Sequence, residues 1–120
     1  MTPTGPWSLG VRGGDFVYVA GMRGVDPNTN TLVAGAAARV RQAFVNMQTI
    51  VAAAGGSLRD AVRLVVYVAE MDRHRPLVNT IQEELWGGPP CLPRSIVEVR
   101  ALNQNDIVEV ARRSSSANTR

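Results

Sequence analysis

Apolar residues recur at spacings of three and four between positions 36 and 54, where Val40, Phe44 and Met47 mark one side of a helical wheel. This period is typical of an amphipathic helix with one buried face. The pair Gly55-Gly56 follows directly, and glycine takes the left-handed conformation that ends many helices at little energetic cost. The pattern therefore predicts a helix that ends at about residue 54.

A second helical pattern runs from Asp72 to about residue 86, with Leu77 and Ile81 on its apolar side. Asp72 is a suitable N-cap, because its side chain can accept a hydrogen bond from the first turn. Pro76 is tolerated only because it lies near that turn. The run Gly87-Gly88-Pro89-Pro90 ends the helix.

The remaining apolar segments are short and rich in β-branched residues, which is typical of strands. The turn formers Gly13-Gly14-Asp15 join the first two segments and predict a tight hairpin. The cluster 26–30, Asp-Pro-Asn-Thr-Asn, predicts that the chain then leaves the sheet in a loop. The predicted strands are residues 8–12, 16–22, 61–68, 94–99 and 107–111.

These elements predict one α+β domain, residues 1–113, in the order β-β-α-β-α-β-β. Residues 16–20 and 64–68 are apolar at every position, so both faces of those strands are apolar. Two helices can cover only one face, and the other would leave an exposed apolar patch of the kind that marks an interface. We therefore expect an oligomer. Residues 114–120, which are polar, are expected to form a disordered tail.

Composition excludes several classes of function. The 13 basic residues are all arginine, which rules out a lysine Schiff base and a Walker A loop. Cys91 and His74 are the only residues of their types, so no intrachain disulfide can form and we assign no metal. No apolar run approaches the roughly 18 residues that span a bilayer. We expect a cytoplasmic protein with His74 on its surface.

The formal net charge of +3 and the pI of about 10.0 raise the possibility of nucleic-acid binding. The arginines are scattered, however, and carboxylates lie between them. Single-strand binding surfaces combine basic with aromatic residues, and no such stripe occurs. The sequence therefore does not favour nucleic acid as a partner.

Several segments, read in order, resemble those of the Rid/YjgF family, the reactive-intermediate deaminases. The last two segments carry most of the resemblance, because an Arg-Ser pair opens an apolar strand and a single glutamate lies within the next one. The resemblance covers about residues 5–111. The matching segments are Gly5-Pro6-Trp7-Ser8, Val19-Ala20-Gly21, Asp26-Pro27, residues 41–46, Leu77-Val78-Asn79, residues 92–99 and Ile107-Val108-Glu109-Val110.

The resemblance implies a chorismate-mutase-like domain with two helices on one face of the sheet. It also implies a homotrimer in which the sheets form a central barrel and clefts lie between subunits. The implied activity is hydrolysis of 2-imino and enamine acids to 2-oxo acids and ammonia, with no cofactor.

Two residues are the principal candidates for this chemistry. Arg94 offers a planar fork of donors that matches a carboxylate in two-point contact, and its alternative is a surface salt bridge. Glu109 lies among apolar residues of the last strand, where burial favours the protonated form. It could position water and exchange protons with the departing amine; its alternative is an edge-strand carboxylate facing water.

The family resemblance also places Trp7, Gly21 and Asn79 at the substrate, together with the main chain of Ile96. Asn79 could equally be an ordinary exposed helix residue, and Gly21 could serve only backbone geometry. Trp7 replaces a family tyrosine and Ile96 a family cysteine, so substrate choice stays open.

Two other functions remain possible. One is a noncatalytic trimer that binds small carboxylates through Arg94. The other, less favoured, is an RNA-binding or RNA-cleaving protein.

Overall fold

The computed structural model describes residues 1–57 and 60–115, and its elements follow the predicted order. The first two strands form the predicted hairpin, with Gly13 opposite Phe16 and Gly14 at φ 59° in the turn. The elements are β1 (Gly10–Gly13), β2 (Phe16–Arg23), α1 (Ala36–Ala53), β3 (Ala61–Val68), α2 (Met71–Trp86), β4 (Arg94–Glu98), the 3₁₀ turn η2 (Asn103–Asn105) and β5 (Val108–Ser115).

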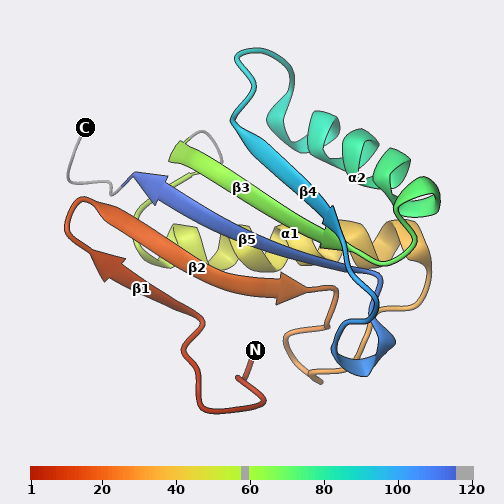
Figure 1. Cartoon of the computed structure of the whole chain (residues 1–120). Helices are drawn as coiled ribbons and strands as arrows, with labels where there is room; N and C mark the ends of the chain where they lie inside the picture. The colour runs from red at the N-terminus through yellow and green to blue at the C-terminus, as the bar shows by residue number, and fades with distance from the viewer. Residues whose placement is uncertain (58–59, 116–120) are drawn as a thin grey trace.

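The five strands form one sheet in the order β1-β2-β5-β3-β4 (Figure 1). All neighbours are antiparallel except β3 and β4, which run parallel. A parallel pair needs a crossover connection, and α2 supplies it. This crossover brings α2 alongside β4, the strand that begins with Arg94.

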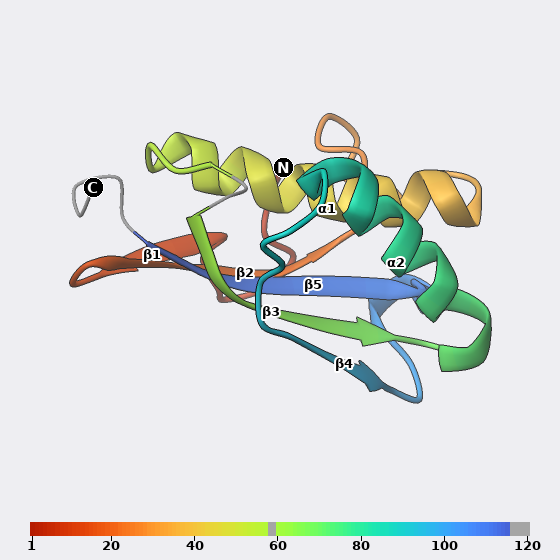
Figure 2. The same cartoon turned by 90° about the horizontal axis from the view of Figure 1, so that it is seen from above.

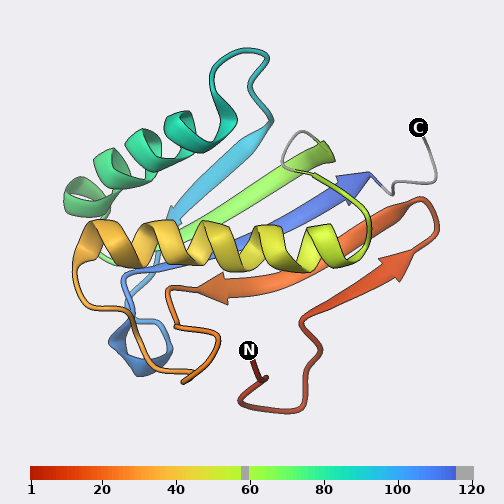
Figure 3. The ribbon, with the colours of Figure 1, turned by 180° about the vertical axis from the view of Figure 1, so that it is seen from behind.

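Both helices lie on the same face of the sheet (Figure 2), as the sequence predicts. Seen from that side, α1 lies in front of the sheet and runs obliquely over the strands (Figure 3). Phe44 of α1 and Trp86 of α2 meet edge to face, with ring centroids 6.0 Å apart. The core between helices and sheet contains Val17, Val19, Met22, Val40, Ala43, Phe44, Met47, Val51, Leu64, Val66, Val68, Val78, Ile81, Trp86, Val108 and Val110.

No helix of the described residues covers the opposite face, which exposes several large side chains. Tyr18 is 42% exposed and Val97 is 43% exposed. The guanidinium of Arg113 lies over the ring of Phe16, 4.0 Å from its centroid. We call this surface the open face. Its apolar content agrees with the prediction that two helices leave one face of the sheet uncovered.

Two expectations for α2 are wrong. The helix begins at Met71, and Glu70, in the left-handed conformation, precedes it as N-cap. Asp72 therefore lies in the first turn, where its negative charge still interacts favourably with the helix dipole. His74 is 2% exposed, and its Nδ1 is hydrogen-bonded with the carbonyl oxygen of Ala69. It is therefore a buried structural residue, and the N-cap of the helix lies two residues before the expected Asp72.

The last strand is longer than predicted. It continues past Ala111 to Ser115, so Ser114 and Ser115 belong to the sheet and not to a tail. Alternation along the strand hides Arg112 and Ser114 on the helix face, where they are 3% and 0% exposed. The extension was not expected because these residues are polar. They can be buried because Arg112 Nε donates a hydrogen bond to Ser114 Oγ at 2.7 Å. Residues 116–120 of the predicted tail lie outside the described residues.

We predict that Ser114→Ala destabilises the fold by about 1–3 kcal/mol, because it leaves the buried Nε–H of Arg112 without that acceptor. Denaturant unfolding would measure the loss. Ser115→Ala is the matched control, since its side chain is only partly buried. Equal stability of the two variants would contradict a structural role for Ser114.

Candidate active site

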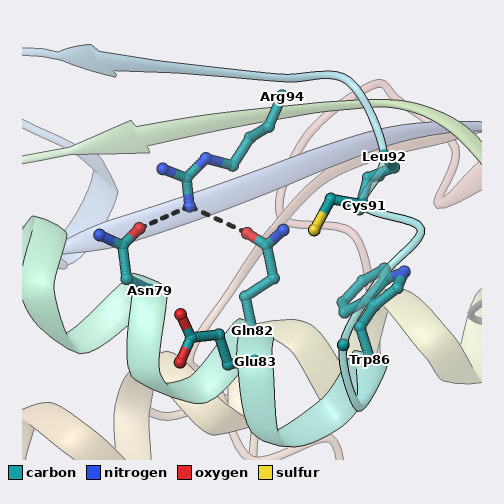
Figure 4. Close-up of a pocket in the computed structure, with 8 residues that line it drawn as sticks. Asn79, Gln82, Glu83, Trp86, Cys91, Leu92 and Arg94 are labelled. Atoms are coloured by element: carbon teal, nitrogen blue, oxygen red, sulfur yellow. Dashed lines mark hydrogen bonds between the residues drawn. The ribbon is translucent and has the colours of Figure 1, made fainter.

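Arg94 opens β4 and lies at the C-terminal half of α2. Parallel pairing places it opposite Leu64, a fully buried residue, so Arg94 is on the helix face. Its Nη1 donates to Asn79 Oδ1 at 2.8 Å and to Gln82 Oε1 at 3.0 Å (Figure 4). Asn79 and Gln82 are three residues apart on α2 and therefore share one side of the helix.

The hydrogen-bond partners of Arg94 among the described residues are both neutral amides. Among the described residues it forms no ion pair. Partial burial, and then the like charge of Arg75, lower the pKa of the Arg94 guanidinium. Arginine nevertheless remains protonated in proteins. A partly buried cation without a counterion is a favourable place for an anionic ligand.

A cavity of about 160 Å³ adjoins this guanidinium, between the end of α2 and the segment that leads into β4. One side is polar and includes Arg94; the other includes Trp86 and Leu92 (Figure 4). The lining residues are Asn79, Gln82, Glu83, Trp86, Gly88, Cys91, Leu92 and Arg94. We call it the arginine cavity.

Glu109 lies in β5 on the open face, opposite Tyr67 of β3. Its side chain extends over Gly21, so closely that a Cβ on Gly21 would be 2.4 Å from Glu109 Oε2. Gly21 falls within a register shift between Val19 and Met22 of β2, where two residues oppose one of β5. Such bulges redirect side chains beside functional sites. Gly21 is thus required by this close approach, and its φ is not in the positive range.

Glu109 is half-buried, and burial raises the pKa of its carboxyl group. The charge of Arg23 opposes this shift and that of Asp106 adds to it. Arg23 is turned toward Asp106, with Nη1 3.6 Å from Oδ2. Among the described residues Glu109 forms no ion pair, so nearby Arg23 does not neutralise it.

Asp106 is fully buried and anchors the turn before β5. It accepts hydrogen bonds from the backbone N–H groups of Gly24 and Ile107, and Arg39 Nε lies 3.8 Å away. This network holds the guanidinium of Arg23 near Asp106, while the pairing of β2 with β5 places Arg23 opposite Glu109. It could not be predicted from the sequence, because Arg23, Gly24 and Arg39 lie far from Asp106 in the chain.

Glu109, Gly21 and Trp7 line a second cavity of about 360 Å³. The chain before β1 brings Trp7 to this place, where its indole is 43% exposed. The other lining residues are Thr4, Ala20, Arg23 and Asn103. We call it the glutamate cavity.

The predicted site residues thus form two separate groups within one chain. Arg94 and Asn79 share the arginine cavity, whereas Trp7, Gly21 and Glu109 share the glutamate cavity. The two cavities have no residue in common, and Arg94 and Glu109 are on opposite faces of the sheet. Ile96 lines neither cavity; its partly buried side chain packs against the core.

Sequence reasoning missed Gln82, the second partner of Arg94. The spacing of three residues from Asn79 could have revealed it, since a helix places both on one side. The described residues include no group of three or more His, Cys, Asp or Glu that could hold a metal ion. Nor does any helix within them have the length and apolar character to cross a membrane.

We predict that Glu109→Gln raises the melting temperature at about pH 8 and that this gain shrinks toward about pH 4. Burial raises the pKa of Glu109 above its unfolded value, so the fold holds the proton more tightly. The charged form therefore lowers stability at high pH, and this effect disappears once the group is protonated in both states. Glu83→Gln, at an exposed position, is the control. A gain that grows on acidification would contradict the assignment.

The sequence matches the family model described as endoribonuclease L-PSP over residues 1–113. A 2-iminobutanoate/2-iminopropanoate deaminase of Dermatophagoides farinae is 34% identical over 110 residues, which cover 90% of this chain and 84% of that protein. A RutC family protein of Pyrococcus horikoshii is 31% identical over 109 residues, covering 90% of this chain and 85% of the relative.

Solved structures show the same fold. A probable translation initiation inhibitor from Rhodopseudomonas palustris has a TM-score of 0.94 at 44% identity, covering 97% of this chain and 90% of that one. The YjgF product of Escherichia coli has a TM-score of 0.88 at 30% identity, with coverages of 94% and 90%. The chain therefore has the chorismate-mutase-like fold predicted for it and belongs to the Rid/YjgF family.

Proposed function

We propose that this protein is a homotrimeric hydrolase that converts 2-imino acids and their enamine tautomers to 2-oxo acids and ammonia. It uses no cofactor in this reaction. The observation that carries the proposal is Arg94, a partly buried guanidinium held by two neutral amides with no ion pair among the described residues. A small carboxylate is its natural partner.

The two cavities become one site only if different subunits contribute them. Arg94 and Glu109 lie on opposite faces of the sheet, so one chain cannot bring both to a single substrate. An assembly that buries the open face could set the arginine cavity of one subunit against the glutamate cavity of the next. The exposed Tyr18 and Val97 on that face favour such burial.

The reaction follows from the two groups. Arg94 holds the carboxylate of the 2-imino acid and so fixes the adjacent C=N carbon. Glu109 takes a proton from a water molecule as the oxygen attacks that carbon, and it returns the proton to the nitrogen. Collapse of the tetrahedral intermediate forms the C=O bond and breaks the C–N bond, while Glu109 passes the hydroxyl proton to the nitrogen, which leaves as ammonia. The raised pKa of Glu109 suits a group that must both accept and donate a proton.

The remaining predicted residues have supporting roles. Asn79 orients Arg94 through Nη1, and Gly21 leaves room for Glu109. Trp7 covers the glutamate cavity with its ring, and the main chain of Ile96, two residues after Arg94 on an edge strand, borders the substrate. Relatives named 2-iminobutanoate/2-iminopropanoate deaminase at 31–34% identity support the choice of reaction.

A noncatalytic carboxylate-binding trimer is the main alternative. This alternative requires Arg94, but it does not explain why Glu109 is half-buried next to Gly21, which leaves room for the carboxylate. Formation of ammonia in step with a trapped 2-oxo acid distinguishes the enzyme from the binding protein. Binding to RNA would instead weaken steeply with salt.

We predict that Gly21→Ala lowers kcat about tenfold to a hundredfold, because displacing a catalytic group by about 1 Å can have that effect. The new Cβ would overlap the Glu109 carboxylate, which must swing aside. Since only the end of a flexible side chain moves, the melting temperature should change little. A parent-like kcat would show that the carboxylate position is unimportant.

We predict that Arg94→Ala weakens binding of 2-oxobutanoate by about tenfold to a hundredfold or more, because a charge-assisted contact is lost. Glu109→Gln should keep this binding and lower kcat by about a hundredfold or more. Calorimetric titration and imine hydrolysis assays would measure both. Light scattering should give the mass of a trimer for each variant, and the mass of a monomer would overturn the shared site. If Arg94→Ala binds 2-oxobutanoate as tightly as the parent, Arg94 is not the carboxylate anchor.

Mixing the two variants tests the shared site directly. After the subunits are unfolded and reassembled together at equal amounts, about a quarter of the interfaces in a cyclic trimer pair an intact Arg94 with an intact Glu109. Activity should then recover to about that fraction of the parent. If the mixture stays as inactive as the separate variants, with mixed trimers present, the site lies within one chain or elsewhere.

A further inference from the structure

The hydrogen bonds of Arg94 leave one edge of its guanidinium available. A guanidinium has five N–H donors: two on Nη1, two on Nη2 and one on Nε. Asn79 and Gln82 are two acceptors for Nη1, at 2.8 and 3.0 Å. Both donors of that nitrogen are therefore engaged, and those of Nε and Nη2 face no acceptor in these contacts.

A carboxylate can bind a guanidinium through two parallel hydrogen bonds. It can approach end-on, across Nη1 and Nη2, or side-on, across Nε and Nη2. The end-on approach needs a donor of Nη1 that Asn79 or Gln82 already occupies. The side-on edge thus remains for the ligand.

The chemistry of the two acceptors is equally important. Amide oxygens orient the guanidinium and leave its positive charge uncompensated. A carboxylate at position 82 would also orient Arg94, but it would form an ion pair and compete with the ligand. Glu83, the next residue, lines the same cavity, yet no ion pair joins it to Arg94 among the described contacts.

We propose that Gln82 is a positioning residue that holds Arg94 Nη1 so that a substrate carboxylate binds side-on to Nε and Nη2, and that an uncharged acceptor is required at this position. The inference rests on the proposed function, in which Arg94 anchors the substrate carboxylate. It adds a residue and a binding geometry to that function.

The test compares Gln82→Glu with the parent, using 2-oxobutanoate as the probe ligand. The substitution keeps the length and one acceptor oxygen but adds a negative charge beside Arg94. Affinity should fall about tenfold or more at neutral pH, while the melting temperature should stay equal or rise because Arg94 gains a counterion. A residue needed only for folding would lower the melting temperature instead, and that result would overturn the proposal.

Two further variants sharpen the comparison. Gln82→Ala frees one donor of Nη1, so KM should rise several-fold with kcat nearly unchanged. Thr80→Glu adds the same charge at an exposed position of α2 outside the arginine cavity, and parent-like affinity is expected there. If Thr80→Glu weakens binding as much as Gln82→Glu, a general charge effect replaces the proposed contact.

The geometry has a direct spectroscopic signature. In the parent, the Nε–H resonance of Arg94, identified by its loss in Arg94→Ala, should shift when 2-oxobutanoate binds. Binding without this shift would overturn the side-on geometry. If Arg94→Ala itself binds the ligand normally, the proposed function fails; if only Gln82→Glu behaves like the parent, the anchor stands and this inference alone is wrong.

Discussion

The alternation of side chains across the sheet is the constraint on which the rest of this structure depends. Successive residues of a strand point to opposite faces, and the pairing of β3 with both β4 and β5 fixes which face each receives. Arg94 consequently lies under α2, and Glu109 lies on the open face. A shift of one residue in either strand would exchange these positions and bury the wrong set of apolar side chains.

The two groups are prepared for their roles in opposite ways. Arg94 is given neutral partners, which preserve its charge for a ligand. Burial raises the proton affinity of Glu109, and the one neighbouring cation that opposes this shift, Arg23, is paired with Asp106. In both cases the important feature is that the described part of the chain pairs no counterion directly with the group.

The order of the elements and the covering of one sheet face were predictable, because the periods of α1 and β3 are regular and glycines mark the turns. The ends of elements were less so. β5 extends to Ser115 because Arg112 and Ser114 satisfy one another on the helix face, which a polar sequence does not reveal. The N-cap of α2 is Glu70, two residues before the expected Asp72, and His74 is buried through its contact with Ala69 instead of lying on the surface.

The candidate site was predictable residue by residue but not as an arrangement. Arg94 and Glu109 follow from their residue types and from the family resemblance. Their separation into two cavities depends on strand register, and Gln82 and Asp106 act through contacts between distant segments. No local pattern contains that information.

The close approach of Glu109 to Gly21 links two positions that are 88 residues apart in the chain. Each limits what the other can become: any side chain at position 21 would require a shorter or differently directed acid at position 109. Among related sequences the two positions should consequently change together. A relative with a larger residue at position 21 would be expected to have a shorter or differently directed acid at 109 and to lose this route to hydrolysis, while retaining the fold.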